Sequence, residues 1–281
     1  MKRFRVRFVC ALAIVFLLGV QQPSEAGIPS TNNLVYEVFV RSFADGDNDP
    51  NKIGDLKGVI SKLDYLNDGN PKTSDDLEIG ILWLMPIFPT RSYHGYDVSD
   101  FRDINPDYGT LDDFKTLVKE AHKRGIRIVL DLPLNHTSSA HPWFKEALKD
   151  ETSPFRSFYQ IRPDASDVPG DWRRITSPSG VKLRYFALFD EGMPDLDYKN
   201  QAVWKEAMEI AKFWLDLGVD GFRLDAAKHI FGDRFTGLQE GEILKNNDFW
   251  LAFSQFTYKI NADAIQSCSA RLVLSAVDDG I

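Results

Sequence analysis

The sequence predicts an α/β protein built on a parallel β-sheet, and three observations support this fold class. Short apolar runs alternate along the chain with segments whose apolar residues recur at helical spacing, as in repeated βα units. The runs are almost uniformly apolar, which is typical of parallel strands covered on both faces. Polar residues gather at the same end of each run. Such a sheet is either doubly wound or closed into a (β/α)8 barrel, and in a barrel the chemistry lies at the carboxyl ends of the strands.

The first half of the chain supplies three of the strands. Residues 34–40 and 126–130 are apolar runs of strand length, and residues 79–85 form a third run that Pro86 closes. A helix over residues 55–66 is predicted from the helical spacing of its apolar residues. A helix over residues 110–124 begins with Thr110 as its N-cap and stops at Gly125.

The second half begins with a change of pattern. Residues 137–198 carry little periodicity, and a plain loop of this length is rare inside a compact domain. We therefore interpret them as a small inserted domain. Helical patterns then predict helices over residues 201–217 and 247–260, and apolar runs predict strands over residues 219–225 and 271–277. The predicted organisation is a signal peptide (1–26), barrel strands one to three (27–136), the inserted domain (137–198) and barrel strands four and five (199–281).

The N-terminus has the composition of a secretory signal peptide. A basic segment, residues 1–7, precedes an apolar run over residues 8–20, and Ser24-Glu25-Ala26 offers a cleavage site. We therefore expect a secreted protein, extracellular or periplasmic, with no membrane attachment after cleavage; an uncleaved anchor is the alternative. The formal net charge of −8 provides no electrostatic footprint for nucleic acid.

Ionisable residues cluster where the predicted strands end. Arg223 and Asp225 are two positions apart, so both point to the same face of their strand. An arginine this close keeps a carboxylate ionised and oriented, which suits a nucleophile; a purely structural pair is the alternative. His136 follows the third strand, and His94 and Tyr96 follow the second. Together these groups predict an open polar pocket with an aromatic platform, which fits a carbohydrate.

Four stretches also resemble the motifs of the α-amylase family of glycoside hydrolases (family thirteen), in the order in which the family carries them. They are SYHGYD (92–97), DLPLNH (131–136), MPDLDY (193–198) and GFRLDAAKH (221–229). The resemblance covers most of residues 33–264, and the third motif is similar to the variant found in secreted bacterial α-amylases. It implies a (β/α)8 TIM barrel with a small domain inserted after strand three. It also implies a secreted enzyme that hydrolyses starch or maltooligosaccharides by a retaining double displacement.

The resemblance implies roles for individual residues. Asp225 would be the nucleophile that attacks the anomeric carbon, and Arg223 would hold it ionised. The two histidines His94 and His136 would hydrogen-bond the sugar, Tyr96 would stack on its ring, and two basic residues after Asp225 would line the leaving-group side. The complete set of implied substrate-binding residues is Tyr96, His94, His136, Lys228, His229 and Asp97.

Oxygen-bearing residues predict calcium as a cofactor. The loop after the first strand spaces oxygen ligands as calcium loops do, with a solvated acidic turn as the alternative. The ligands of this first site would be Asp45, Asp47, Asp49, Ile53 and Asp55. The resemblance implies a possible second calcium between the barrel and the inserted domain, at Asn135 and Asp195.

The resemblance stops before the second catalytic carboxylate. A retaining glycosidase needs a general acid/base, which the family carries as a Glu at the end of strand five. Here Ser275 occupies that position, and no Glu follows Glu242. The last predicted strand is about the fifth of eight, and the family's third carboxylate, an Asp after strand seven, has no counterpart. We therefore expect a C-terminally truncated or frame-shifted version of a longer gene.

Two hypotheses follow for the function. In the first, the chain is the N-terminal part of an α-glucan hydrolase. In the second, it is a catalytically inactive remnant or a carbohydrate-binding protein. Within the family, an α-1,6-glucosidase, a neopullulanase and a transglycosylase also stay open, because the loops that would select among them follow strands five to eight.

Overall fold

The structure is a computed structural model that describes residues 34–47, 50, 52–164, 170–231, 240–264 and 272–275. The predicted signal peptide and Asp49 of the predicted calcium loop lie outside the described residues. Within these ranges, none of the helices combines the length and the apolar character that a membrane span requires.

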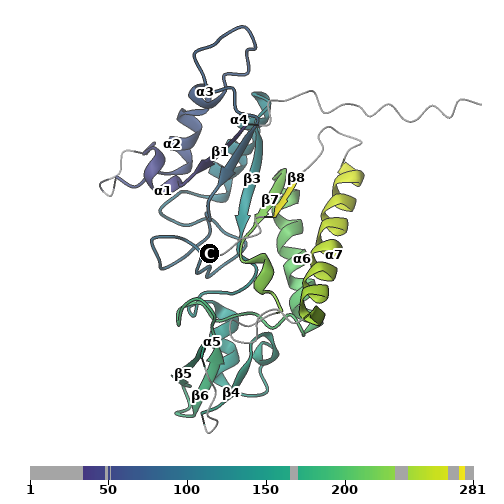
Figure 1. Ribbon diagram of the computed structural model, residues 1–281. Helices are drawn as coiled ribbons and strands as arrows, with labels where there is room; N and C mark the ends of the chain where they lie inside the picture. Colours follow the sequence, from purple (N-terminus) through teal and green to yellow (C-terminus); the bar gives the residue numbers. More distant parts are fainter. Residues whose placement is uncertain are drawn as a thin grey trace, which may run out of the picture. The chain divides into compact units, whose positions relative to one another are not determined.

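Five parallel strands form the main sheet, and their order in space follows their order in the chain (Figure 1). All neighbouring pairs are parallel, so the five carboxyl ends meet at one edge. A doubly wound sheet reverses its strand order at a switch point, and this sheet does not, as expected for part of a barrel wall. The predicted fold class is therefore confirmed. In spatial order the strands are β1 (Val35–Val38), β2 (Ile81–Leu84), β3 (Arg127–Leu132), β7 (Gly221–Leu224) and β8 (Leu272–Ser275).

Helices connect the strands close to the positions that the sequence predicts. The clearest case, α4, begins with a capping box in which Thr110 and Asp113 bond each other's backbone N–H. The predicted helix over residues 55–66 is interrupted at Lys62, which lies between α2 and α3. The helices of the barrel part are α1 (Val40–Phe43), α2 (Leu56–Ser61), α3 (Leu63–Leu66), α4 (Leu111–Lys123), α6 (Gln201–Asp216) and α7 (Glu240–Ala264).

Several element boundaries differ from the sequence prediction, and two of them have a clear reason. The first strand ends at Val38, because Val40 already belongs to the short helix α1. The last helix, α7, begins at Glu240 instead of residue 247. Its apolar residues do not follow one helical face closely, which is why the periodic pattern located only part of it.

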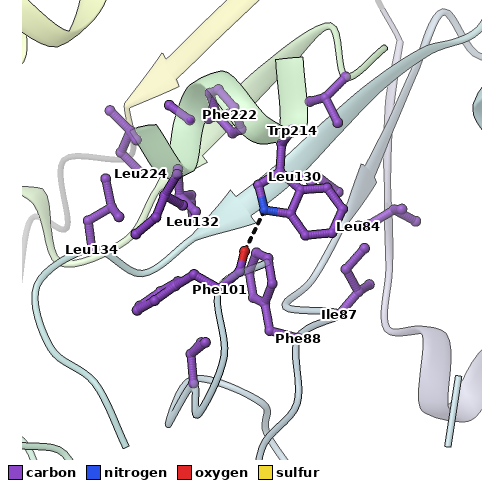
Figure 2. Close-up of a cluster of buried hydrophobic side chains, with 14 of the residues drawn as sticks. Leu84, Ile87, Phe88, Phe101, Leu130, Leu132, Leu134, Trp214, Phe222 and Leu224 are labelled. Atoms are coloured by element: carbon purple, nitrogen blue, oxygen red, sulfur yellow. Dashed lines mark hydrogen bonds between the residues drawn. The ribbon is translucent and has the colours of Figure 1, made fainter. Parts of the chain in front are cut away.

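The core of the sheet also positions the loop that follows β2. Trp214 of α6 is fully buried, and its indole N–H donates to the carbonyl of Phe101 at 2.7 Å (Figure 2). A buried indole needs such a partner, so this bond ties helix α6 to the loop. The apolar side chains around it in Figure 2 come from three strands, from that loop and from the segment that follows β3; they include Leu84, Ile87, Phe88, Leu130, Leu132, Leu134, Phe222 and Leu224.

The segment predicted as an inserted domain contains its own small sheet. Three antiparallel strands pair in the order β4-β6-β5. A helix of eight residues precedes them that the sequence pattern missed, because it spans only about two turns. The elements are α5 (Pro142–Lys149), the 3-10 turn η1 (Arg156–Phe158), β4 (Ile161–Pro163), β5 (Trp172–Thr176) and β6 (Lys182–Phe186). The domain boundaries at residues 137 and 198 stay a prediction.

Candidate active site

One arginine serves two carboxylates at the carboxyl edge of β3 and β7. Arg223 Nη1 donates to Asp225 Oδ1 at 2.6 Å, and to Asp131 Oδ1 and Oδ2 at 3.1 and 3.2 Å. The strand register pairs Asp131 with Arg223, which explains why the two meet. The guanidinium also lies 5.4 Å from the ring centroid of Trp83. The expectation that Arg223 and Asp225 share one face of the strand is confirmed.

Asp131 is a site residue that the sequence analysis missed. Its side chain is inaccessible to solvent, and burial, offset in part by Arg223, raises the pKa of Asp131 to about 7. Asp225 keeps 22% of its side chain exposed and receives the shortest bond from the arginine. The guanidinium charge therefore acts mainly on Asp225 whenever Asp131 holds its proton. A carboxylate directly after the apolar run Ile128–Leu130, within a buried strand, was the signal that could have identified Asp131.

Tyr96 is fixed from three sides. Its hydroxyl donates to Asp131 Oδ2 at 3.0 Å, and its backbone N–H donates to His94 Nδ1 at 3.1 Å. The rings of His94 and Tyr96 stack with centroids 6.0 Å apart. His136 Nε2 donates to the Tyr96 carbonyl at 3.2 Å, and burial lowers the pKa of His136 to about 4, so this imidazole is neutral at pH 7. His136 is only 2% exposed, and this hydrogen bond fixes the backbone of Tyr96.

The carboxylate of Asp97, which was predicted to bind substrate, is hydrogen-bonded within its own loop. Its carboxylate accepts hydrogen bonds from the hydroxyls of Thr90 and Ser92 and from two backbone N–H groups of the same loop. It is 8% exposed. Asp97 therefore shapes the loop that carries His94 and Tyr96, and the structure does not bring its carboxylate into the open site.

Helix α7 anchors the turn that follows Asp225. Ala226 has a left-handed backbone conformation, with φ of 50°, and the 3-10 turn η2 (Ala227–His229) begins directly after it. The side chain of Asn246 donates to the carbonyl of Lys228 at 2.8 Å, and the indole of Trp250 donates to the carbonyl of Ala227 at 2.8 Å. Nothing in the helical pattern distinguished Asn246 or Trp250 from its neighbours, so the sequence analysis missed both.

Phe189 of the inserted segment lies between two predicted sugar-binding histidines. Its ring centroid is 5.5 Å from that of His136 and 5.6 Å from that of His229, and the second contact is edge-to-face. The side chain remains 40% exposed. Phe189 therefore forms an apolar wall beside the turn that carries Lys228 and His229. The local sequence does not separate this residue from the core aromatics around it.

The structure brings together three residues of the first predicted calcium site. Carboxylate oxygens of Asp45, Asp47 and Asp55 lie within 4.8 Å of one another. Asp55 is buried, caps α2 and accepts the backbone N–H groups of Gly46 and Asp47 at 3.1 Å each. Like charges this close favour a shared cation, and oxygen ligands suit Ca²⁺. The side chain of Ile53, whose carbonyl was the predicted ligand, packs against the core.

The second predicted calcium pair fits a different arrangement. Asn135 Nδ2 donates to Asp195 Oδ2 at 3.0 Å, and the other oxygen of Asp195 accepts the Leu188 N–H at 3.0 Å. Burial raises the pKa of Asp195 to about 7. Both carboxylate oxygens thus have neutral donors, and two side chains are far fewer ligands than the six to eight that Ca²⁺ takes. Asn135 and Asp195 thus form a hydrogen-bonded link between the end of β3 and the inserted segment, and the second calcium site stays a prediction.

The fold and the site together define a class of protein. A parallel sheet of barrel type that carries an arginine-held aspartate at its carboxyl edge fits a barrel enzyme, because such enzymes hold their chemistry at that edge. The family model of the alpha-amylase catalytic domain matches residues 37–274. The chain therefore belongs to the α-amylase family of glycoside hydrolases.

Individual relatives agree with this assignment. The chain is 43% identical over 257 residues to alpha-amylase 3 of Dictyoglomus thermophilum, a match that covers 91% of this chain and 46% of that protein. It is 41% identical over 217 residues to an oligo-1,6-glucosidase of Parageobacillus thermoglucosidasius, covering 74% of this chain and 36% of that protein. The solved structure of an alpha-amylase from H. orenii superposes with a TM-score of 0.74 at 45% identity, covering 89% of this chain and 48% of that one. The chain thus spans less than half the length of these relatives.

Proposed function

We propose that this chain is the nucleophile-bearing part of a secreted α-glucan hydrolase that cleaves starch and maltooligosaccharides by a retaining double displacement. The observation that carries the proposal is the 2.6 Å bond from Arg223 to Asp225, at the edge of the sheet where barrel enzymes hold their chemistry. The proposed export rests on the pattern of residues 1–26.

The described side chains supply the first half of this mechanism. Asp225 attacks the anomeric carbon and forms a covalent glycosyl ester as the bond to the leaving-group oxygen breaks, and the hydrogen bond from Arg223 holds the attacking carboxylate in place. Tyr96, which Asp131 and the two histidines hold in place, stacks on the sugar ring in the cleaved position. Because Asp131 is buried beneath Tyr96 and Arg223, it has no access to the leaving group and acts only on its neighbours.

The second half of the mechanism needs a general acid/base about 5–5.5 Å from the nucleophile. The backbone register pairs Ser275 with Leu224, the residue before Asp225. Ser275 thus stands one strand away from the nucleophile, at the position that the resemblance assigns to the acid. A missing acid would cost about 10²–10⁴-fold in rate with an ordinary glycoside.

Similarity to α-amylases supports α-1,4-linked glucan as the substrate class. The two α-amylases match 91% and 89% of this chain, whereas the oligo-1,6-glucosidase matches 74%. An α-1,6-glucosidase activity is therefore the weaker candidate, and isomaltose is the control substrate that separates the two.

We propose Ca²⁺ as the cofactor, held by the acidic loop between β1 and α2. Asp45, Asp47 and Asp55 would be its ligands, and the ion would offset the repulsion among these carboxylates. It would stabilise the loop and take no part in the reaction steps.

A substrate with a leaving group that needs no proton tests the nucleophile by itself. The purified chain is incubated with α-maltosyl fluoride, and mass spectrometry detects the glycosyl ester on Asp225. We expect the ester in the parent and in the control Asp216→Asn, whose carboxylate only pairs with Lys212 at the surface, and we expect none in Asp225→Asn. An unlabelled parent that still binds maltooligosaccharides would favour the carbohydrate-binding alternative. Equal labelling of Asp225→Asn would refute the assigned nucleophile.

A further inference from the structure

The small antiparallel sheet of the inserted segment (Figure 1) carries three arginines in a row on one face. The strand register places Arg162 of β4 opposite Arg184 of β6, and Arg184 opposite Arg174 of β5. Residues directly opposite each other in an antiparallel sheet share a face. Lys182 lies two residues before Arg184 on β6 and therefore shares this face as well. We call these four residues the basic row.

The opposite face of the sheet is apolar and packs against the core. Leu183 and Tyr185 are buried, and Ile161 and Ile175 pack against the buried cluster. Side chains alternate between the two faces along a strand, so the basic row belongs to the solvent side. Polar residues are normal on a solvent face and do not by themselves indicate a ligand. The distribution of charge on this face is what points to one.

The charges on this face do not balance. Like charges directly opposite each other on paired strands are destabilising, and arginines face each other here in both strand pairs. Along the described part of the face, Asp164 provides one carboxylate, whose Oδ1 accepts from Arg184 Nε at 2.6 Å and from Arg174 Nε at 3.2 Å. Four basic residues against one carboxylate leave an excess of positive charge, although the chain as a whole has a formal net charge of −8.

Two members of the basic row are already held in place. The guanidinium of Arg162 lies 3.6 Å from the ring centroid of Trp172, and Arg184 is only 8% exposed. Side chains that are fixed in advance lose little conformational freedom when a ligand binds. Arg174, with 72% of its side chain accessible, and the exposed Lys182 are the cations that a ligand can reach directly.

Hollows border the basic row at both of its ends. At the β4 end, a hollow of about 180 Å³ includes Arg162, together with the carboxylates of Asp195 and Asp197, which offset part of its charge. At the β5 end, a hollow of about 410 Å³ is lined by Arg174 and Lys182, and among its described residues the carboxylate is the one that the arginines already share. The β5 end is therefore the stronger site for an anion.

The spacing of the row indicates the kind of anion. Guanidinium groups bind carboxylates and phosphates through paired N–H bonds, and neighbouring strands place them at steps of about 4.8 Å. A sugar in an extended polysaccharide advances by a similar distance, so one carboxylate on each sugar matches the row. Duplex DNA carries one charge per about 1.7 Å of its axis, which is far denser than the row can match.

We propose that the basic row is a docking surface for an acidic polysaccharide that carries one carboxylate on each sugar. Arg174 and Lys182 bind carboxylates of the polymer directly, while Arg162 and Arg184 maintain the positive potential of the face. The surface lies on the inserted segment and uses none of the groups around Asp225. Docking therefore does not require the proposed hydrolase activity, and it would attach the protein to an anionic polymer while its other site acts on glucan.

The test compares a charged polymer with its neutral form. Polygalacturonate and fully methyl-esterified polygalacturonate, which keeps the chain but lacks the charge, are titrated into the purified full chain at about 50 mM salt, where charge interactions are weakly screened. Binding is followed by calorimetry. The double variant Arg174→Gln/Lys182→Gln removes two exposed charges of the row. The matched control Lys119→Gln/Lys205→Gln removes two exposed charges from α4 and α6.

We expect the parent to bind polygalacturonate and not its methyl ester. Arg174→Gln/Lys182→Gln should weaken this binding about 5- to 20-fold, whereas the control variant should bind like the parent. Lys182→Gln alone, which leaves the pair between Arg174 and Asp164 intact, should weaken it about 2- to 5-fold. Added salt should weaken binding more steeply in the parent than in the double variant, because fewer ion contacts remain in the variant.

The other outcomes contradict specific steps. A parent chain that does not bind polygalacturonate would overturn the docking surface. Equal losses in Arg174→Gln/Lys182→Gln and in the control variant would overturn it too, since binding would then follow the overall charge. Equal affinity for the methyl ester would show that carboxylates are not recognised. Tighter binding of a DNA duplex than of polygalacturonate would overturn the acidic polysaccharide as the partner. The nucleophile is tested separately, by its labelling with α-maltosyl fluoride.

Discussion

Replacing Asp131 with Asn should change how the stability of the protein depends on pH. The carboxyl of Asp131 is buried between β3 and β7, and burial raises its pKa from 3.8 to about 7. Asn has nearly the same shape and stays neutral at every pH, so it mimics the protonated acid. The amide oxygen of Asn can accept the hydrogen bond from Arg223, and its NH2 group can donate to the Tyr96 hydroxyl, which turns to accept, as it also does when the acid at this position is protonated.

The sign of the effect follows from proton linkage. Below about pH 4, Asp131 is protonated in both the folded and the unfolded chain. Between pH 4 and 7 only the folded chain keeps the proton, so the parent loses stability as the pH rises. A shift of about three pH units at 1.36 kcal/mol each amounts to about 4 kcal/mol of stability lost by pH 8. Asp131→Asn lacks this loss, so its stability relative to the parent should rise by about 2.5 kcal/mol between pH 5 and pH 8, because the remainder of the loss falls below pH 5.

Urea unfolding between pH 4.5 and 8.5 measures this difference. The two buried histidines with lowered pKa values, His136 and His141, change the stability of parent and variant alike and cancel in the comparison. Asp100→Asn, a substitution at an exposed position, should follow the parent at every pH. If the curves of Asp131→Asn and the parent run parallel across this range, the reasoning about the buried carboxyl is wrong.

Three further predictions concern other parts of the chain. Asn246→Ala should lower the free energy of unfolding by about 2–3 kcal/mol, because two hydrogen bonds to the turn after the nucleophile are lost. Thermal unfolding measures this loss, with Asn247→Ala at the exposed neighbouring position as the control. Equal losses in the two variants would contradict the prediction. Thr110→Ala should cost about 1 kcal/mol through loss of the N-cap of α4, whereas Thr116→Ala on the same helix should cost less, as chemical denaturation will measure. Calcium at 100 times its dissociation constant should stabilise the fold by about 2.7 kcal/mol, which is measured as a higher Tm that EGTA reverses. Asp47→Asn should reduce this increase in Tm. A Tm that does not respond to calcium would exclude the site.

Much of the fold could be predicted because its pattern is local. The apolar runs of β2, β3 and β7 and the capped helix α4 each carry their signal within a few consecutive residues. The helix α5 could not be predicted because its apolar face spans only two turns, and the early start of α7 could not be predicted because its apolar residues do not follow one face.

The sequence alone predicted the motif residues. It also predicted that Arg223 and Asp225 lie on the same face of their strand, because side chains two positions apart on a strand share a face. The tertiary structure decided everything that crosses between elements. Asp131 meets Arg223 only through the register of β3 with β7, and Asn246 supports the turn only because α7 packs beside it. Asp97 is buried, and its carboxylate is satisfied by hydroxyls and backbone N–H groups of its own loop and by Ser138. Local periodicity determines which face of a helix or strand a side chain lies on. The burial of that side chain and its hydrogen-bond partners depend on packing between segments that are far apart in the chain.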